Sequence, residues 1–158
     1  MTDLFFLEPD EGDAWYPFVD CRPVCELRVG AWLVRERWEG VSRAESAAIF
    51  ARRHLHGFVE DGTPPVRERS PVAGPAFVAR SDFAPSGAAP TLPKGPASLV
   101  NDGVVVGWWV PEGTTWNGEL SGAQEVEIEG VALLGAWDVI TGMEHLLAAD
   151  VADFTHEP

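Results

Sequence analysis

The chain of 158 residues is poor in lysine and cysteine and has no long apolar run. Lys94 is the only lysine, and the 11 basic residues face 25 acidic ones. The resulting net charge of −14 argues against a nucleic-acid-binding protein, because such a surface repels a phosphate backbone. It leaves open a nucleotide ligand that is held by a few local arginines.

No apolar segment is long enough to span a bilayer, and the N-terminus lacks the basic region and apolar core of a signal peptide. We therefore expect a soluble cytoplasmic protein without a membrane partner. In that compartment the two cysteines, Cys21 and Cys25, are interpreted as free thiols. The length and the hydrophobic content of 46% predict one globular domain over residues 1–158, of unknown oligomeric state.

The first half of the chain predicts one strand and two helices. Leu4–Leu7 is an apolar run typical of a buried strand. Residues 31–39 have one apolar stripe, which predicts a helix that ends at Gly40. Ser42 and Glu45 have the spacing of a capping box, which predicts a second helix from about residue 43 to 55. His54 and His56 near its end are interpreted as structural residues, because no third metal ligand is close in sequence.

The second half is mainly strands and turns. Residues 60–96 are rich in proline and glycine and predict a long loop region with one strand at 76–79. Residues 98–103 and 104–110 predict a hairpin, and 125–134 predicts a strand with a glutamate-lined wet face. A last helix is expected at 139–149, with Ile140, Met143, Leu146 and Leu147 on its buried side. An acidic, frayed tail is expected at 150–158.

The stretch from Cys21 to Gly30 carries most of the functional signal, because it holds two arginines just before a patterned helix. A helix N-terminus presents unpaired N–H groups and partial positive charge, which suit an anion-binding loop. Arg22 and Arg28 are therefore candidate ligand-binding residues. The alternative is that both arginines form structural ion pairs with nearby acids: Asp20, Glu26 or Glu36.

Residues 16–39 resemble the N-terminal segment of a sugar nucleotidyltransferase-like family related to the bifunctional N-acetylglucosamine-1-phosphate uridylyltransferases. That family has the motif PLTxTRPVAxLRVG followed by a helix that ends REKWE, and this chain reads CRPVCELRVG and RERWE. Weaker landmarks lie at 99–101, 137–140 and 153–154. The resemblance implies a three-layer, Rossmann-like α/β sandwich with a mostly parallel sheet, in complete or reduced form.

The resemblance also implies a reaction and a set of roles. The reaction is NTP plus sugar-1-phosphate giving nucleotide-sugar and pyrophosphate, with Mg²⁺ as the expected cofactor. Arg22 and Arg28 match the two arginines of the motif and would donate to phosphate oxygens as catalytic residues. The expected substrate-binding residues are Pro23, Gly30, Lys94 and Asn101, and the expected metal ligand is Asp102. On pattern alone, Asn101 and Asp102 also suit a plain hairpin turn, and Lys94 suits an exposed turn.

The segment after the first strand departs from the pattern. Well-characterised nucleotidyltransferases have a glycine-rich loop with a basic residue there, whereas residues 8–16 contain four acids and no base. Two functions therefore stay open: a sugar nucleotidyltransferase, of full or reduced activity, and a catalytically inactive domain that binds a nucleotide or nucleotide-sugar or mediates assembly. A third possibility, an unrelated acidic α+β interaction protein, requires that the motif match is chance.

Overall fold

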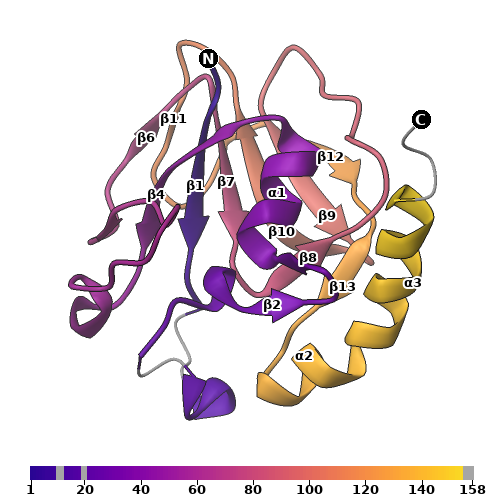
Figure 1. Ribbon diagram of the computed structural model, residues 1–158. Coiled ribbons are helices and arrows are strands. Elements are labelled where there is room, and N and C mark those ends of the chain that lie inside the picture. Colours follow the sequence, from indigo (N-terminus) through magenta and orange to yellow (C-terminus); the bar gives the residue numbers. More distant parts are fainter. Residues whose placement is uncertain (10–12, 19–20, 155–158) are drawn as a thin grey trace.

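A seven-stranded sheet forms the centre of the computed structural model, which describes residues 1–9, 13–18 and 21–154 (Figure 1). The strand order is β12-β9-β10-β7-β1-β4-β5. The strands are β1 (Asp3–Leu7), β4 (Glu45–Phe50), β5 (Val66–Arg67), β7 (Ala76–Arg80), β9 (Ala97–Asn101), β10 (Val104–Val110) and β12 (Gln124–Glu127). Only β10 runs against the other six, so the sheet is mostly parallel, as predicted.

Each face of the sheet is covered by a different kind of layer. Leu4 and Phe6 of β1 face the core beneath helix α1 (Val34–Ser42), where the indole N–H of Trp38 donates to Phe83 O at 3.0 Å. Alternate side chains such as Phe5 face a second cluster, closed by the two-stranded ribbon of β6 (Val72–Ala73) and β11 (Thr115–Trp116). The three layers are therefore helix, sheet and β-ribbon, a reduced form of the predicted α/β sandwich.

The remaining elements surround the sheet. A hairpin of β2 (Arg28–Val29) and β3 (Trp32–Leu33) precedes α1, and β8 (Phe83–Pro85) pairs with β13 (Gly130–Ala132). Helices α2 (Ala136–Thr141) and α3 (Met143–Phe154) pack at the side of the molecule (Figure 1). Short 3₁₀ turns among the described residues include η1 (Asp13–Trp15), η3 (Val24–Glu26) and η4 (Arg53–Leu55). Among the described residues, none of the helices has the length and apolarity needed to cross a membrane.

The predicted second helix is wrong: residues 45–50 form the parallel strand β4. Ala48, Ile49 and Phe50 are all buried because both faces of this strand are covered, and such a continuous apolar run has no strand period. Ser42 ends α1 instead of starting a helix. Its hydroxyl donates to Trp38 O at 2.6 Å and accepts from the backbone N–H of Ala44.

Other predicted elements are confirmed or refined. The strands at 4–7 and 76–79, and the hairpin around Asn101–Gly103, are present as β1, β7 and β9–β10. The predicted loop region 60–96 also contains β5, β6 and β8. The predicted strand 125–134 is two strands in different sheets, β12 and β13. The predicted last helix is the pair α2 and α3, and Asp150, assigned to the tail, is buried within α3.

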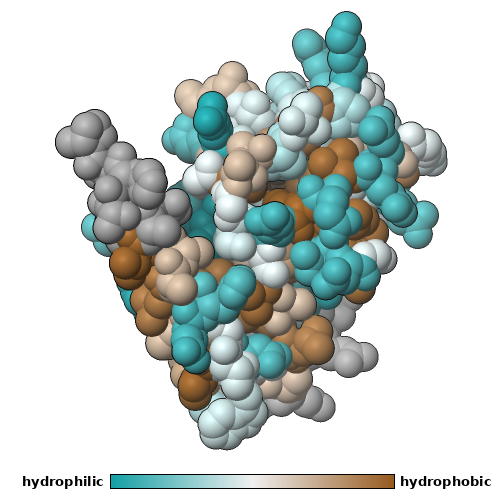
Figure 2. All heavy atoms as spheres, turned by 90° about the vertical axis from the view of Figure 1, so that its right-hand side faces the viewer, coloured by the Kyte–Doolittle hydropathy of each residue, from teal (hydrophilic) through white to brown (hydrophobic). Residues whose placement is uncertain are grey.

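The outer face of α2 and α3 is more hydrophobic than the sequence pattern predicted. Only Leu146 of the expected inner residues is fully buried, whereas Ile140 and Leu147 are 60% and 38% exposed. Trp137, also on α2, is 79% exposed. Figure 2 looks onto this side of the molecule and shows hydrophobic residues at the surface among hydrophilic ones. The helix pair is therefore attached by few buried side chains.

Candidate functional site

The carboxyl ends of the parallel strands meet at one edge of the sheet, called here the carboxyl edge. The chain passes from β1 to β4 and β5 on one side of β1, and then crosses to β7 on the other side. The strand order therefore reverses between β1 and β7. Ligands of open α/β sheets bind at such a reversal, outside the carboxyl ends of the strands. The residues that follow Leu7 and Arg80 therefore lie where a ligand of this sheet is expected to bind.

Glu8 follows β1 and turns inward at this reversal. The residue is only 9% exposed, and its carboxylate accepts hydrogen bonds from the backbone N–H groups of Val24, at 2.8 Å, and Cys25, at 3.4 Å. Burial raises the pKa of Glu8 above its ordinary value, and the nearby charge of Asp82 adds to the rise, although the amide donors oppose it. The N–H groups at the start of η3 thus hold the chain's own carboxyl group.

Arg80 and Asp82 follow on the other side of the reversal. The Arg80 guanidinium donates from Nε to Asp82 Oδ1 at 2.8 Å and from its terminal nitrogen to Oδ2 at 2.5 Å. It also donates to Val105 O at 3.4 Å, across to β10. Both carboxylate oxygens of Asp82 are therefore engaged by a forked donor.

The predicted phosphate-binding arginine Arg22 lies near the carboxyl edge, in the segment that leads into η3. It forms an ion pair with Glu60, donates to Glu26 O at 3.3 Å, and lies 5.9 Å from the ring centre of Phe58. Its side chain is 36% exposed, so the pair with Glu60 faces solvent. Pro23 is buried and precedes η3 with φ −59°. Asp20, a suggested partner, lies outside the described residues.

Arg28 and Gly30 lie in the β2–β3 hairpin, so this segment does not lead straight from Arg22 into the helix. Arg28 is exposed and donates to Ala31 O across the hairpin turn. Gly30 has φ +74°, and a Cβ atom there would lie 2.5 Å from both Arg37 Nη2 and Asp150 Oδ2. The backbone at Gly30 therefore passes close to the buried ion pair that Arg37 and Asp150 form.

Asn101 and Asp102 reach the carboxyl edge at the end of β9 and hold the hairpin against β12. Asn101 donates from its side chain to Ile128 O at 2.9 Å, and the backbone N–H of Asp102 donates to Glu127 Oε1 at 3.0 Å. Asp102 has φ +49° and is exposed. Lys94 lies in the segment that enters β9 at the opposite edge, so the structure does not bring it to the other candidates.

The described residues do not provide a ready-made metal centre. They contain no group of three or more histidine, cysteine or carboxylate side chains that could hold an ion. Cys21 and Cys25 are free cysteines, as expected. His56 Nε2 lies 3.0 Å from Ala51 O, which accounts for it as a structural residue.

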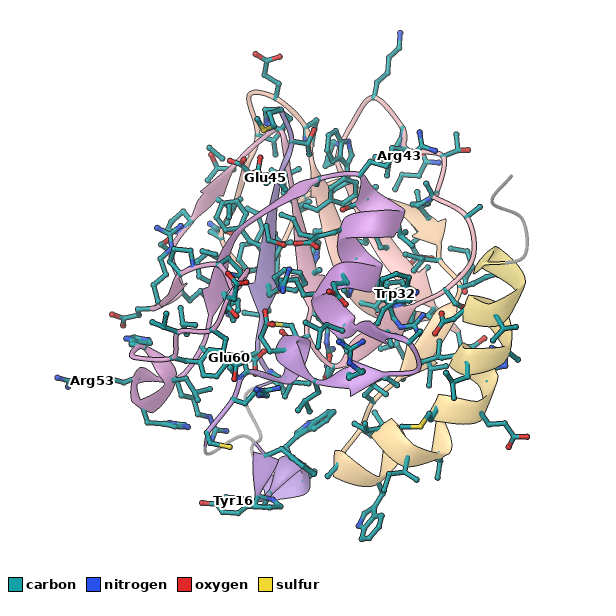
Figure 3. All side chains as sticks on the ribbon, in the orientation of Figure 1. Tyr16, Trp32, Arg43, Glu45, Arg53 and Glu60 are labelled. Carbon is teal, nitrogen blue, oxygen red and sulfur yellow. The ribbon has the colours of Figure 1, made fainter. Side chains whose placement is uncertain are left out.

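A groove with basic walls runs along the carboxyl ends of β1, β4 and β5, and we call it the basic groove. It consists of two cavities of about 200 and 430 Å³ that share Ala51, Arg52 and Glu68. The first extends to Glu8 and Arg69, and the second to Arg53 and His56. Figure 3 shows Arg53 and Glu60 at this edge and Arg43 and Glu45 at the opposite one.

Sequence reasoning missed the arginines of the basic groove for a specific reason. The predicted helix from about residue 43 to 55 placed Arg52 and Arg53 in its last turn, where basic residues are favoured without any ligand. Had residues 45–50 been recognised as a parallel strand, two arginines directly after its end would have marked a ligand edge. Arg69 had no comparable signal, because its neighbours in space, Trp116 and Gly118, are distant in sequence.

Comparison with known proteins identifies the family of the chain. A search of curated proteins finds no match to the chain. The family model described as sugar nucleotidyl transferase matches residues 4–157, which is nearly the whole chain. This length of match excludes a chance resemblance of the arginine motif alone. The chain therefore belongs to the sugar nucleotidyl transferase family.

Proposed function

We propose that the protein transfers a nucleotidyl group from an NTP to a sugar-1-phosphate, giving a nucleotide-sugar and pyrophosphate. The observation that carries the proposal is the family match over residues 4–157, supported by cavities at the carboxyl edge beside the strand reversal. A relationship to N-acetylglucosamine-1-phosphate uridylyltransferases belongs to the same proposal. So does a cytoplasmic location, where nucleoside triphosphates are available.

In this reaction an oxygen of the sugar phosphate attacks the α-phosphorus of the NTP, and the bond to the pyrophosphate oxygen breaks. Cationic donors lower the barrier by stabilising charge on the phosphate oxygens. We propose that Arg22 is one such donor, released from Glu60 when the substrate binds, and that Pro23 sets its position. Exposed ion pairs of this kind contribute little, so the exchange of partners costs little. Arg28 and Gly30, in the β2–β3 hairpin, are weaker candidates.

Divalent metals are general in this family, and Mg²⁺ would neutralise phosphate charge if it were bound. The described carboxylates do not fit a preformed site for it. Asp82 has both oxygens engaged by Arg80, Glu8 is buried against backbone amides, and Asp102 belongs to no group of three possible ligands among the described residues. A requirement for Mg²⁺, and a role for Asp102 or Asn101 in binding, are therefore questions for the turnover assay with and without the ion.

The same engagement of Glu8 and Asp82 favours a second candidate function. A domain whose acidic groups at the strand reversal are held by its own arginine and amides can bind a nucleotide or nucleotide-sugar without turning it over. This candidate predicts binding but no pyrophosphate.

The test is pyrophosphate release from each of four NTPs with hexose-1-phosphates, with and without Mg²⁺, in parallel with melting curves. Turnover supports the enzyme, whereas a rise in melting temperature without pyrophosphate supports the binding domain. No turnover and no shift in any mixture would contradict both. Arg22→Ala is expected to abolish turnover and ligand-induced stabilisation while leaving the unliganded melting temperature within a few degrees, because its ion pair is exposed.

A further inference from the structure

A bound triphosphate requires positively charged side chains close to its phosphate oxygens. The segment after β1 contains no basic residue, and its first member, Glu8, points inward to η3. The whole chain carries a net charge of −14, which disfavours a polyanion over most of its surface. Cations that bind phosphates must therefore be gathered locally.

Basic side chains are gathered at the ends of β4 and β5. Arg52, Arg53, Arg67 and Arg69 are four of the 11 basic residues of the chain. Three of them line the basic groove, together with His56. Glu68 is the one exposed acid among the groove residues named here. Glu8, the other acid, is buried and hydrogen-bonded to backbone amides, so three arginines and one exposed acid face the groove, which is therefore positive relative to its surroundings.

Arg69 is held in position by packing instead of by an acid. Its guanidinium lies 4.8 Å from the ring centre of the fully buried Trp116. Gly118, with φ +122°, leaves space for it, since a Cβ atom there would lie 2.5 Å from Arg69 Nη2. No ion pair between described residues includes Arg69. A stacked guanidinium loses little further freedom when it binds an anion, which favours affinity.

We propose that the basic groove binds the oligophosphate chain of the nucleotide, with guanidinium groups from the ends of β4 and β5 replacing the basic residue missing after β1. Arg69 supplies a fixed forked donor at the Glu8 end, and Arg53 supplies an adaptable one at the other end. This inference rests on the proposed function for the identity of the nucleotide. The anion-binding part stands on the groove alone.

The experiment measures binding of inorganic tripolyphosphate to the full chain by calorimetry at low ionic strength, without metal. Each of Arg53→Ala and Arg69→Gln is expected to weaken binding by about tenfold or more, as expected for loss of a charge-assisted hydrogen bond. Arg43→Gln removes an equal charge from the exposed end of α1 at the opposite edge and is expected to bind like the wild type. Binding is also expected to weaken as salt is raised.

Several outcomes overturn the inference. They are no binding of tripolyphosphate by the wild type, or equal losses in Arg43→Gln and the groove variants. Arg53 is exposed and projects from the edge, so its variant is expected to fold normally and decides the matter if Arg69→Gln does not fold (Figure 3).

Nucleotide assays separate this inference from the proposed function. Tripolyphosphate binding that the groove arginines control, with no pyrophosphate release from any substrate pair, supports the groove and refutes the enzyme. Turnover with an unchanged KM for NTP in both groove variants supports the enzyme and refutes the groove.

Discussion

The ion pair between Arg37 and Asp150 links α1 to α3, and its removal gives the largest expected loss of stability. The two side chains are 5% and 4% exposed, with Arg37 Nη2 2.6 Å from Asp150 Oδ2. The same carboxylate oxygen accepts from the N–H of Ala31 at 2.8 Å, and Arg37 also donates twice to Val29 O. Asp150→Ala leaves a buried guanidinium without its counter-charge and a backbone donor without its partner.

Loss of one partner of a buried ion pair typically costs about 3–5 kcal/mol, against a total stability of roughly 5–15 kcal/mol for a domain. For a chain of this length the melting temperature is expected to fall by about 6–20 °C. Asp150→Asn keeps an acceptor for the amide and is expected to lose less. The double variant Arg37→Met/Asp150→Leu removes both charges and is expected to recover the part of the loss that comes from the uncompensated guanidinium, although Ala31 N–H and Val29 O still lack these partners.

The assay is urea unfolding followed by tryptophan fluorescence, with calorimetry for the melting temperature. A loss below about 1 kcal/mol in Asp150→Ala, in the range of exposed pairs, would refute the reasoning that this pair is desolvated. A double variant that is as unstable as the single one would show that packing, instead of uncompensated charge, causes the loss.

Three further expectations concern the other constrained groups. Gly30→Ala is expected to destabilise the protein by more than Gly113→Ala, because the Cβ added at Gly30 would collide with Arg37 and Asp150. Gly113 has a similar φ of +78°, but the space around its added Cβ is open. Equal losses of stability in urea unfolding would contradict the predicted collision. Because the folded state raises the pKa of Glu8 from 4.5, it binds that proton more tightly than the unfolded chain, so stability falls as pH rises from about 4.5 through the raised pKa. Glu8→Gln is expected to lack this part of the pH dependence, and identical pH profiles in unfolding experiments would count against it. Arg80→Met frees both oxygens of Asp82 and is expected to strengthen Mn²⁺ binding measured by electron paramagnetic resonance; unchanged affinity would argue that Arg80 does not block the carboxylate.

The sequence predicted the elements whose patterns are local. The apolar runs of β1 and β7 and the turn at Asn101–Gly103 are fixed by neighbouring residues, so they could be recognised directly. Residues 45–50 could not, because a strand buried on both faces has no alternation, and burial on both faces is a property of the whole sheet. The apparent capping box led to the same wrong prediction of a helix. Ser42 and Glu45 have the spacing of a helix start, but Ser42 closes the preceding helix.

The candidate site was partly predictable. The motif around Arg22 indicated the family, and the family gave the class of fold. The contacts of Arg22 and Arg28 with Glu60 and Ala31 depend on a loop and a hairpin whose positions no local pattern specifies. Arg69 is held by Trp116, 47 positions later in the chain, which only the three-dimensional structure reveals.

The bond between Arg37 and Asp150 spans 113 positions in the chain, and this separation bears on how the protein is made. During synthesis the N-terminal part leaves the ribosome first, and Arg37 lacks this counter-ion until α3 emerges. Contacts of such long range also slow folding, because a large loop must close before they form. Nascent chains that stop short of Asp150 are therefore expected to stay open to proteases and chaperones until α3 can pack against the β2–β3 hairpin.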